Sequence, residues 1–272
     1  PARPEPGAIV RLTLDPRPAR ADSIRTVTGH MAGEPLHFVR ADSGRWRAIG
    51  AVPVNADRTV LASVVVTRAS GKTEAVRATV VVPPVEPPKA EPLTVDTAFT
   101  QLDSLAVARV ARENERAREL GRRSHTTPRM WTSAFHRPRG AAVTGVFGSG
   151  RSFNGRVTSR HLGVDFKGVT GDDVQAANRG VVALVDTFLL AGTVVYVDHG
   201  AGVVTGYFHL SKPLVTAGDT VSRGQSIALV GATGRVTGAH LHWSARYGAL
   251  TVNPLDLVAL DRRWYAVPAG SR

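Results

Sequence analysis

From about residue 141 to residue 257, short apolar and β-branched stretches alternate with glycine-containing turns, and no apolar repeat of helical spacing interrupts them. Short strands separated by tight turns are typical of antiparallel β structure, in which sequential strands pair directly. The segments that we expect to form strands are residues 181–186, 193–198, 203–209, 225–230 and 240–245. The sequence therefore predicts a compact antiparallel β domain in this part of the chain.

A second β pattern occupies residues from about 7 to 83. Val10, Leu12 and Leu14 alternate with polar residues, and a β-branched run follows at residues 60–66. Clusters of turn-forming residues separate such runs, and Trp46 is a candidate core aromatic residue. We expect a small immunoglobulin-like sandwich here, and we see no catalytic pattern in it.

The connection between the two β regions has a different composition. Residues 83–88 are rich in proline, which predicts an extended and stiff hinge. Residues 96–120 then show one apolar stripe at helical spacing, formed by Phe99, Leu102, Ala106 and Val110. We expect an amphipathic helix that packs by one face on a neighbouring domain, or alternatively docks a partner. Thr94 or Asp96 would cap its start and Gly121 its end, and residues 122–140 would form a basic linker.

The charge of the chain restricts its partners. The sequence has 34 Lys and Arg residues against 22 Asp and Glu residues, a net charge of +12, which favours polyanions such as acidic membranes or anionic cell-wall polymers. No nucleic-acid-binding motif is visible, so nucleic acid is not the expected main partner. No apolar run reaches the roughly 18 residues of a membrane span. The absence of cysteine excludes disulfides and thiolate metal ligands.

Three short segments bring together residues suited to a metal site: His161 to Asp165, Tyr207 to Leu210, and His240 to Trp243. His240 and His242 are two residues apart in an expected strand, so their side chains share a face. We expect His161 and Asp165 to lie where a strand passes into a loop, with both side chains turned inward. Catalytic zinc usually takes three protein ligands and keeps one position open for water.

The other histidines carry less information. His199 lies between Asp198 and Gly200, in a turn-like context, and we interpret it as structural. His30, His37, His125 and His136 lie outside the second β domain and show no pairing in the sequence.

The order His-x-x-x-Asp, Tyr-x-His-Leu-Ser and Thr-Gly-x-His-Leu-His-Trp resembles the LytM-domain, lysostaphin-type zinc endopeptidases of bacterial cell walls. The resemblance covers about residues 141–257 and includes the Phe153-Asn154-Gly155 segment; it departs from many members at Ala239, where they have proline. It implies one Zn²⁺ per chain, held by His161, Asp165 and His242. It further implies that His209 and His240 are catalytic and flank the open position, and that Asn154 and Tyr207 contact the substrate.

We therefore expect an all-β dominated chain with four parts. These are an immunoglobulin-like β domain with its proline-rich hinge (1–88), a helical linker (89–140), a zinc metalloendopeptidase domain (141–257) and a C-terminal tail (258–272). The resemblance implies that the third part has the LytM-type antiparallel sheet, also called the duplicated hybrid motif.

The function implied by the resemblance is hydrolysis of peptide stems or cross-links of peptidoglycan through a metal-activated water. The bond would be a D-Ala to diamino-acid cross-link or a Gly-Gly bridge, and the first is favoured because no C-terminal wall-binding module is recognisable. We expect the chain to act outside the cytoplasm, in the periplasm, at the wall or after secretion, with its signal peptide removed.

Three alternatives remain open. The chain could be a latent enzyme whose groove is covered by the N-terminal domain or linker. It could be a non-catalytic LytM-type regulator that binds a wall-assembly or regulatory protein through its N-terminal domain, although all five site positions are present. It could also be a structural zinc module, although such sites usually have four protein ligands, often cysteines.

Overall fold

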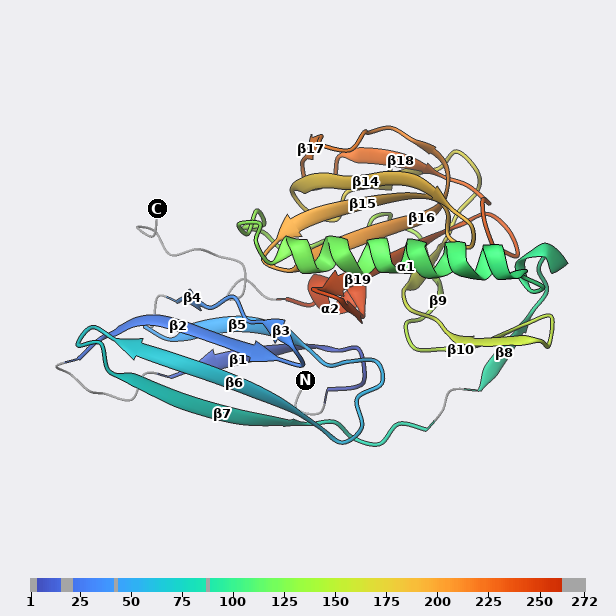
Figure 1. Ribbon diagram of the computed structural model, residues 1–272. Coiled ribbons are helices and arrows are strands. Elements are labelled where there is room, and N and C mark those ends of the chain that lie inside the picture. The colour runs from blue at the N-terminus through green and yellow to red at the C-terminus, as the bar shows by residue number, and fades with distance from the viewer. Residues whose placement is uncertain (1–3, 16–21, 42–43, 87–88, 261–272) are drawn as a thin grey trace.

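The computed structural model describes residues 4–15, 22–41, 44–86 and 89–260 of the chain. Figure 1 shows two β units, one from the N-terminal part and one from the C-terminal part, with a long helix lying along the second unit. Residues 87 and 88 of the predicted hinge and residues 261–272 of the predicted tail lie outside the described residues.

The N-terminal unit consists of two antiparallel sheets that share one core. The first sheet has the order β1-β5-β4 and the second has the order β3-β2-β6-β7. The side chains of β6 alternate strictly between exposed and buried over residues 59–66, because β-branched residues on one face of the strand enter the core between the sheets. The strands are β1 (Ile9–Leu14), β2 (Ile24–Met31), β3 (Glu34–Pro35), β4 (Val39–Arg40), β5 (Trp46–Ala51), β6 (Thr59–Arg68) and β7 (Thr73–Val81).

The C-terminal unit is built on a ten-stranded sheet whose main path has the order β17-β14-β15-β16-β19-β12-β9, and β13, β18 and β20 pair alongside that path. All five strands predicted in this region are present. The strands are β9 (Val143–Gly145), β12 (Val164–Lys167), β13 (Asp173–Gln175), β14 (Gly180–Phe188), β15 (Gly192–Gly200), β16 (Val203–Pro213), β17 (Thr220–Val221), β18 (Ser226–Val230), β19 (His240–Tyr247) and β20 (Leu250–Val252). A short helix, α2 (Pro254–Val258), follows.

A separate three-stranded sheet connects the two halves of the chain. Strand β8 (Ala90–Leu93) pairs in parallel with β10 (Gly150–Phe153), which pairs in antiparallel with β11 (Val157–Arg160). The segment that leaves the N-terminal unit therefore becomes an edge strand beside the C-terminal unit, and it is not only an extended hinge.

The long helix α1 (Ser104–Ser124) begins later and ends later than the sequence predicts. Asp103 caps it by accepting a hydrogen bond from the Ala106 amide at 2.7 Å, whereas Asp96 caps only the short 3-10 helix η1 (Thr97–Phe99). Gly121 lies inside the helix and does not end it. A Cβ at this position would lie 1.8 Å from the carbonyl oxygen of Gly248. The glycine thus allows the backbone of α1 to touch the C-terminal unit.

The buried face of α1 consists of small and polar residues, Glu113, Ala117, Gly121 and Ser124. The Glu113 carboxylate accepts hydrogen bonds from the Leu189 amide and from Arg109, so this buried charge has partners. Leu105 and Val107 point to solvent. The helix thus covers the strands β14 to β16 by close approach, and the apolar stripe predicted from the sequence is only partly buried.

The predicted basic linker is part of the core. Trp131 and Phe135 are each 2% exposed and contact each other edge-to-face within the main core cluster. Residues of the N-terminal unit, including Ile9 and Ile49, belong to the same cluster. No helix in the described part of the chain is long and apolar enough to cross a membrane.

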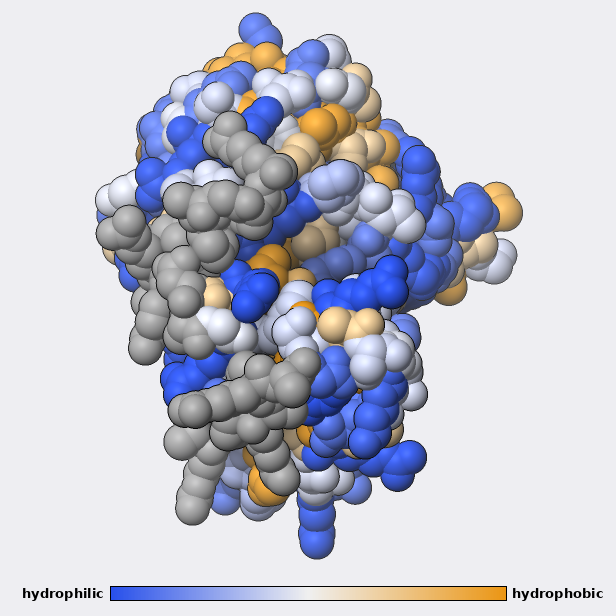
Figure 2. All heavy atoms as spheres, turned by 90° about the vertical axis from the view of Figure 1, so that its left-hand side faces the viewer, coloured by the Kyte–Doolittle hydropathy of each residue, from blue (hydrophilic) through white to orange (hydrophobic). Residues whose placement is uncertain are grey.

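The two units also contact each other through a polar network. Glu34 of β3 accepts hydrogen bonds from the His125 ring at 2.8 Å and from the Ala249 amide at 3.0 Å. His125 in turn contacts His37 at 2.8 Å, a pairing that the sequence did not indicate. Figure 2, which views the molecule from the side of the left-hand edge of Figure 1, shows a hollow where the units meet, and a cleft between them is lined in part by His37, His125 and Trp131.

Candidate metal centre and surrounding groove

The strand register explains why the three candidate ligands meet. Strands β12 and β19 are antiparallel, and Asp165 is directly opposite His242 while Lys167 is opposite His240. Directly opposed side chains on one face of an antiparallel pair lie close together. His161 follows β11 and reaches the same point from the loop before β12. His161 lies where β11 passes into a loop, as predicted, whereas Asp165 lies in the next strand, β12, and both residues are buried.

The three ligand atoms form a compact cluster. Oδ1 of Asp165 lies 3.1 Å from Nε2 of His161 and 2.9 Å from Nδ1 of His242, and these two nitrogens are 2.9 Å apart. All three residues are buried, and among the described residues they form the group of His, Asp and Glu side chains that could hold a metal ion. Two imidazoles and one carboxylate are the donor set that zinc commonly takes.

The tautomer of His161 fits metal binding. Its Nδ1 lies 2.9 Å from the carbonyl oxygen of Val146, which can only accept a hydrogen bond, so the proton is on Nδ1. The Nε2 lone pair then points at the cluster, as a ligand requires, and the carbonyl fixes the ring from behind.

His242 is also prepared to be a neutral ligand. Burial, the largest cause, lowers the pKa of His242 below its usual value, so the ring is uncharged at neutral pH. The ring stacks on Phe208 at a centroid distance of 5.2 Å. Gly163 is required beside it, because a Cβ at that position would lie 2.5 Å from Nε2 of His242.

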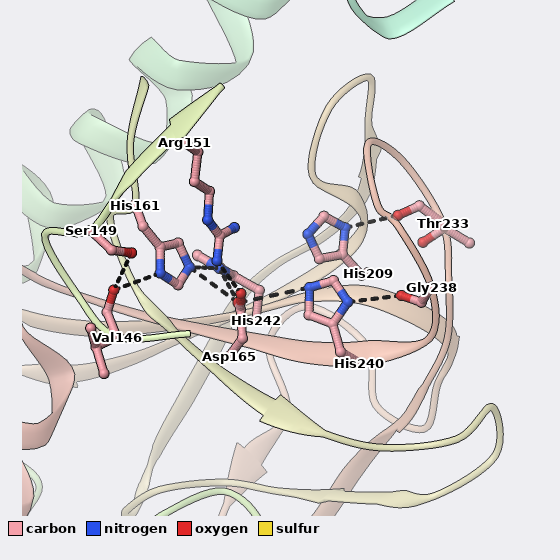
Figure 3. A network of polar contacts seen from close by, with 10 residues as sticks. All are labelled: Val146, Ser149, Arg151, His161, Asp165, His209, Thr233, Gly238, His240 and His242. Atoms are coloured by element: carbon pink, nitrogen blue, oxygen red, sulfur yellow. Dashed lines mark hydrogen bonds and ion pairs between the residues drawn. The ribbon is translucent and has the colours of Figure 1, made fainter. Parts of the chain in front are cut away.

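Asp165 is held in its charged form. Burial raises the pKa of this carboxyl, but hydrogen bonds with His161 and His242 outweigh that effect and hold the pKa below its usual value. Arg151 of β10 forms an ion pair with the second oxygen, Oδ2, so that Oδ1 remains for the cluster. Figure 3 shows the Arg151 guanidinium against this carboxylate. The sequence pattern gave no signal for Arg151.

The two predicted catalytic histidines lie together beside the cluster. Figure 3 shows His209 and His240 next to each other, on the side of Asp165 away from His161, with ring centroids 4.9 Å apart. The Nδ1 atom of His209 bonds the carbonyl of Thr233 and that of His240 bonds the carbonyl of Gly238, both at 2.8 Å. The Nε2 atoms of both rings are left for the groove, and that of His240 lies 3.7 Å from Oδ1 of Asp165.

An unusual backbone conformation brings His209 to this side. Its φ of 62° is left-handed, which is uncommon outside glycine and which clusters at functional sites. With a regular extended conformation at this position, the alternation of β16 would leave Phe208 on the metal side, where it stacks on His242, and would turn His209 into the core. Burial, followed by the charges of His240 and His242, lowers the pKa of His209 to about 3.

The same conformation makes one prediction wrong. Regular alternation would place Tyr207 on the same face as His209, but Tyr207 is opposite Trp243 in the core and is 0% exposed. Its hydroxyl accepts a hydrogen bond from the Ala177 amide at 2.8 Å. Tyr207 therefore does not line the groove.

Asn154 does not face the cluster either. It occupies a turn with Gly155, and both residues have left-handed φ values, of 51° and 66°. Its side-chain amide accepts a hydrogen bond from the Val95 amide at 3.0 Å and donates one to the Val95 carbonyl at 2.9 Å. The side chain thus ties the turn to the segment after β8, which is a structural role.

The groove beside the cluster has walls from distant parts of the chain. Glu91 and Leu93 of β8 line one part, and residues 235–240 line another, together with Lys167 and Phe153. None of these residues except His240 was predicted, because each enters from a separate loop or strand.

His199, interpreted as structural, lies in the core. It is 0% exposed, its Nδ1 bonds the Arg179 carbonyl and its Nε2 bonds the hydroxyl of Thr205, both at 2.8 Å. Thr205 in turn contacts the Tyr207 hydroxyl at 3.0 Å. This chain of hydrogen bonds lies beneath β16 and supports the strand that carries His209.

Comparison with known proteins agrees with this geometry. Residues 159–254 match the model of Peptidase family M23, and this stretch includes all five clustered residues, His161, Asp165, His209, His240 and His242. The family match thus covers the part of the chain that holds the cluster.

Two curated relatives from Vibrio cholerae are named as peptidoglycan DD-endopeptidases. ShyA is 44% identical over 95 residues, which are 35% of this chain and 22% of ShyA. ShyB is 41% identical over 133 residues, which are 49% of this chain and 28% of ShyB. The matched stretches thus span about a quarter of the length of these relatives.

One solved structure resembles almost the whole chain. It is a crystal structure from Pseudomonas aeruginosa assigned to peptidase M23, with a TM-score of 0.70 and 25% identity, and the match covers 94% of this chain and 95% of that one. The likeness therefore includes the N-terminal strands and α1, which the family model does not reach.

Proposed function

We propose that this protein is a zinc-dependent endopeptidase that hydrolyses peptide stems or cross-links of bacterial peptidoglycan. The observation that carries the proposal is the convergence of His161, Asp165 and His242 on one point, with two further histidine Nε2 atoms facing the same groove. The names of ShyA and ShyB support peptidoglycan as the substrate. Action on that polymer would take place outside the cytoplasm.

The donor set fits zinc, and His161, Asp165 and His242 would hold it. A bound zinc ion would supply a Lewis acid and a water molecule of lowered pKa. The residues of the chain provide the remaining elements of hydrolysis. The lowered pKa of His209 keeps its ring neutral, and its Nε2 faces the groove beside His240, so this pair of rings can accept a proton from the attacking water and return it to the leaving amine. The new bond joins the water oxygen to the carbonyl carbon while the carbon–nitrogen bond breaks.

We also infer the fold of the N-terminal unit and the boundaries between the parts of the chain. Two sheets that share one core support an immunoglobulin-like sandwich in residues 1–88. The family match and the sheet of residues 143–252 support a peptidase domain at 141–257. A helical linker at 89–140 is supported by α1, although this segment also contributes β8 and two buried aromatic residues.

The test measures metal content and cleavage separately. Purified peptidoglycan is incubated with the zinc-loaded protein, and the products are identified by mass spectrometry. We expect His242→Ala to lose both zinc and cleavage, whereas His209→Ala and His240→Ala keep zinc and lose cleavage. His30→Ala, on the exposed face of β2, serves as the matched control and should keep both. Loss of zinc in His209→Ala or His240→Ala would show that the ligand assignment is wrong.

A latent enzyme is a second candidate because β8, which precedes the peptidase domain, lines the groove. A shorter chain beginning near Ala141 would not test latency, since it would remove Trp131 and Phe135 from the core. The substitution Glu91→Ala with Leu93→Ala, which trims the β8 wall in the full chain, is the better test. A rise in cleavage would support latency, and unchanged or lower cleavage would exclude it.

A further inference from the structure

We propose that Arg235 binds a carboxylate on the leaving side of the scissile bond, so that the groove selects cross-links whose leaving amine is attached to a carbon bearing a carboxylate. This inference rests on the proposed function and specifies the substrate class of the same site. It assigns the substrate-binding role to a residue that the sequence analysis did not single out.

Both the backbone and the side chain of Arg235 are held in place. It lies in the loop between β18 and β19, where its amide donates a hydrogen bond to the Leu190 carbonyl at 2.9 Å. Its guanidinium carbon lies 3.9 Å from the centroid of the Phe153 ring, which is itself 5% exposed. A guanidinium held on a fixed aromatic ring loses little further conformational freedom when it binds a ligand. The side chain lines the same groove as Asp165, His209 and His240.

Arg235 has donors available for a ligand. In the described part of the chain, its guanidinium has the Phe153 ring as its contact and makes no hydrogen bond or ion pair. Arg151, in contrast, is committed to Asp165. The residue is half-buried, and burial, followed by the charge of Arg151, lowers the pKa of Arg235. A carboxylate would supply the hydrogen-bond acceptor that the Arg235 guanidinium lacks.

The other charges of the groove agree with an anionic ligand group. Lys167 lies on the same face as Asp165, opposite His240 in the strand register, and lines the groove. Among the lining residues in the described ranges, Asp165 and Glu91 are the acidic ones. Asp165 is occupied by the metal cluster and Arg151, and Glu91 is exposed on the edge strand β8. Once the Arg151–Asp165 pair is set aside, the groove has two basic side chains, Lys167 and Arg235, against one carboxylate, Glu91.

The chemistry of the candidate bonds decides which substrate this arrangement recognises. In a cross-link between D-alanine and diaminopimelate, the leaving nitrogen is attached to a carbon that also bears a free carboxylate. The corresponding carbon of a lysine cross-link bears none, and the carboxyl of a bridge glycine is already in an amide bond. Arg235 and His240, the candidate proton donor to the leaving amine, both line this groove. We therefore assign the carboxylate that Arg235 binds to the leaving side of the bond.

The test compares two synthetic cross-linked dimers that differ in this carboxylate, one with diaminopimelate and one with lysine as the leaving residue. Charge-assisted hydrogen bonds of this kind correspond to roughly 10- to 100-fold in kcat/KM, so we expect the zinc-loaded wild type to prefer the diaminopimelate dimer by that ratio. Arg235→Gln should bring the ratio close to one, and Arg235→Lys should restore part of it. Arg156→Gln, an exposed residue of the turn before β11, is the matched control and should keep the wild-type ratio.

Two results would overturn the inference: a wild type that cleaves both dimers equally well, or an Arg235→Gln variant that keeps the wild-type ratio. If the wild type cleaves neither dimer, the proposed function fails, and the inference is then decided by calorimetric binding of the same two dimers. A tighter Kd for the diaminopimelate dimer that depends on Arg235 would uphold carboxylate recognition. Equal Kd values for both dimers would refute it.

Discussion

Neutral His199 should make the stability of this protein depend on pH. The ring is fully buried, and its Nδ1 must donate to the Arg179 carbonyl, which leaves Nε2 to accept from Thr205. Burial lowers the pKa of His199 from 6.5 to about 4, although the Arg179 carbonyl and the charge of Asp198 act in the opposite direction. This difference corresponds to about 3 kcal/mol between the folded and unfolded states.

The sign of this pH dependence follows from whether the folded or the unfolded protein protonates His199 at the higher pH. As pH falls below about 6.5, the unfolded chain takes up a proton at this residue while the folded protein does not. The stabilisation is therefore complete above the unfolded pKa, and it is lost progressively until the pH reaches the folded pKa of about 4. His37 and His209 have lowered pKa values as well, so only a comparison between variants isolates the contribution of His199.

The substitution His199→Gln keeps a donor and an acceptor but removes the titration. Urea unfolding would be followed by tryptophan fluorescence between pH 7.5 and pH 4, with a chelator present so that metal binding does not contribute. Between these limits, we expect the free energy of unfolding of the wild type to fall by about 3 kcal/mol more than that of the variant. His30→Gln, on the exposed face of β2, should follow the wild type. Parallel pH profiles for wild type and His199→Gln would refute the reasoning.

Two further substitutions test the packing around the site, both measured by the free energy of unfolding. Gly121→Ala would normally stabilise a helix by about 1 kcal/mol, but here its Cβ would lie 1.8 Å from the Gly248 carbonyl oxygen. We expect a net loss of about 1–3 kcal/mol, while Gly140→Ala, which has open space around it, should be nearly neutral. Trp131→Ala removes a core side chain and should cost about 3–5 kcal/mol; a cost near zero would mean that residues 126–140 are a dispensable linker after all.

The parts of the fold and site that depend on short sequence spacing could be predicted. The five strands of the C-terminal unit follow from apolar runs between glycine turns, and the shared face of His240 and His242 follows from the two-residue repeat of a strand. The meeting of His161 with His242 could not be derived from spacing, because it depends on the register between β12 and β19, and it came from the family resemblance.

Features that depend on a single backbone conformation or on distant segments were missed. The left-handed conformation of His209 breaks the alternation and turns His209 toward the groove, whereas Tyr207 keeps its regular place in the core. The helix start was placed too early, because Asp96 and Asp103 are both good caps and only tertiary packing selects between them. Arg151 and Arg235 reach the groove from separate segments, and isolated arginines in a chain with many basic residues carry no spacing signal.

Because β8 forms part of the groove wall, the wall and the candidate metal centre should differ in local stability. Ala90 pairs with Gly150, so forming this wall closes a long loop at an entropic cost, and three of the four residues of β8 are exposed. The candidate ligands Asp165 and His242, in contrast, lie on β12 and β19, which are interior strands of the large sheet. Local unfolding should therefore release β8 first and widen the groove while these two residues stay in place. Amide hydrogen exchange that is faster in β8 than at Asp165 would reveal this local opening of the groove wall.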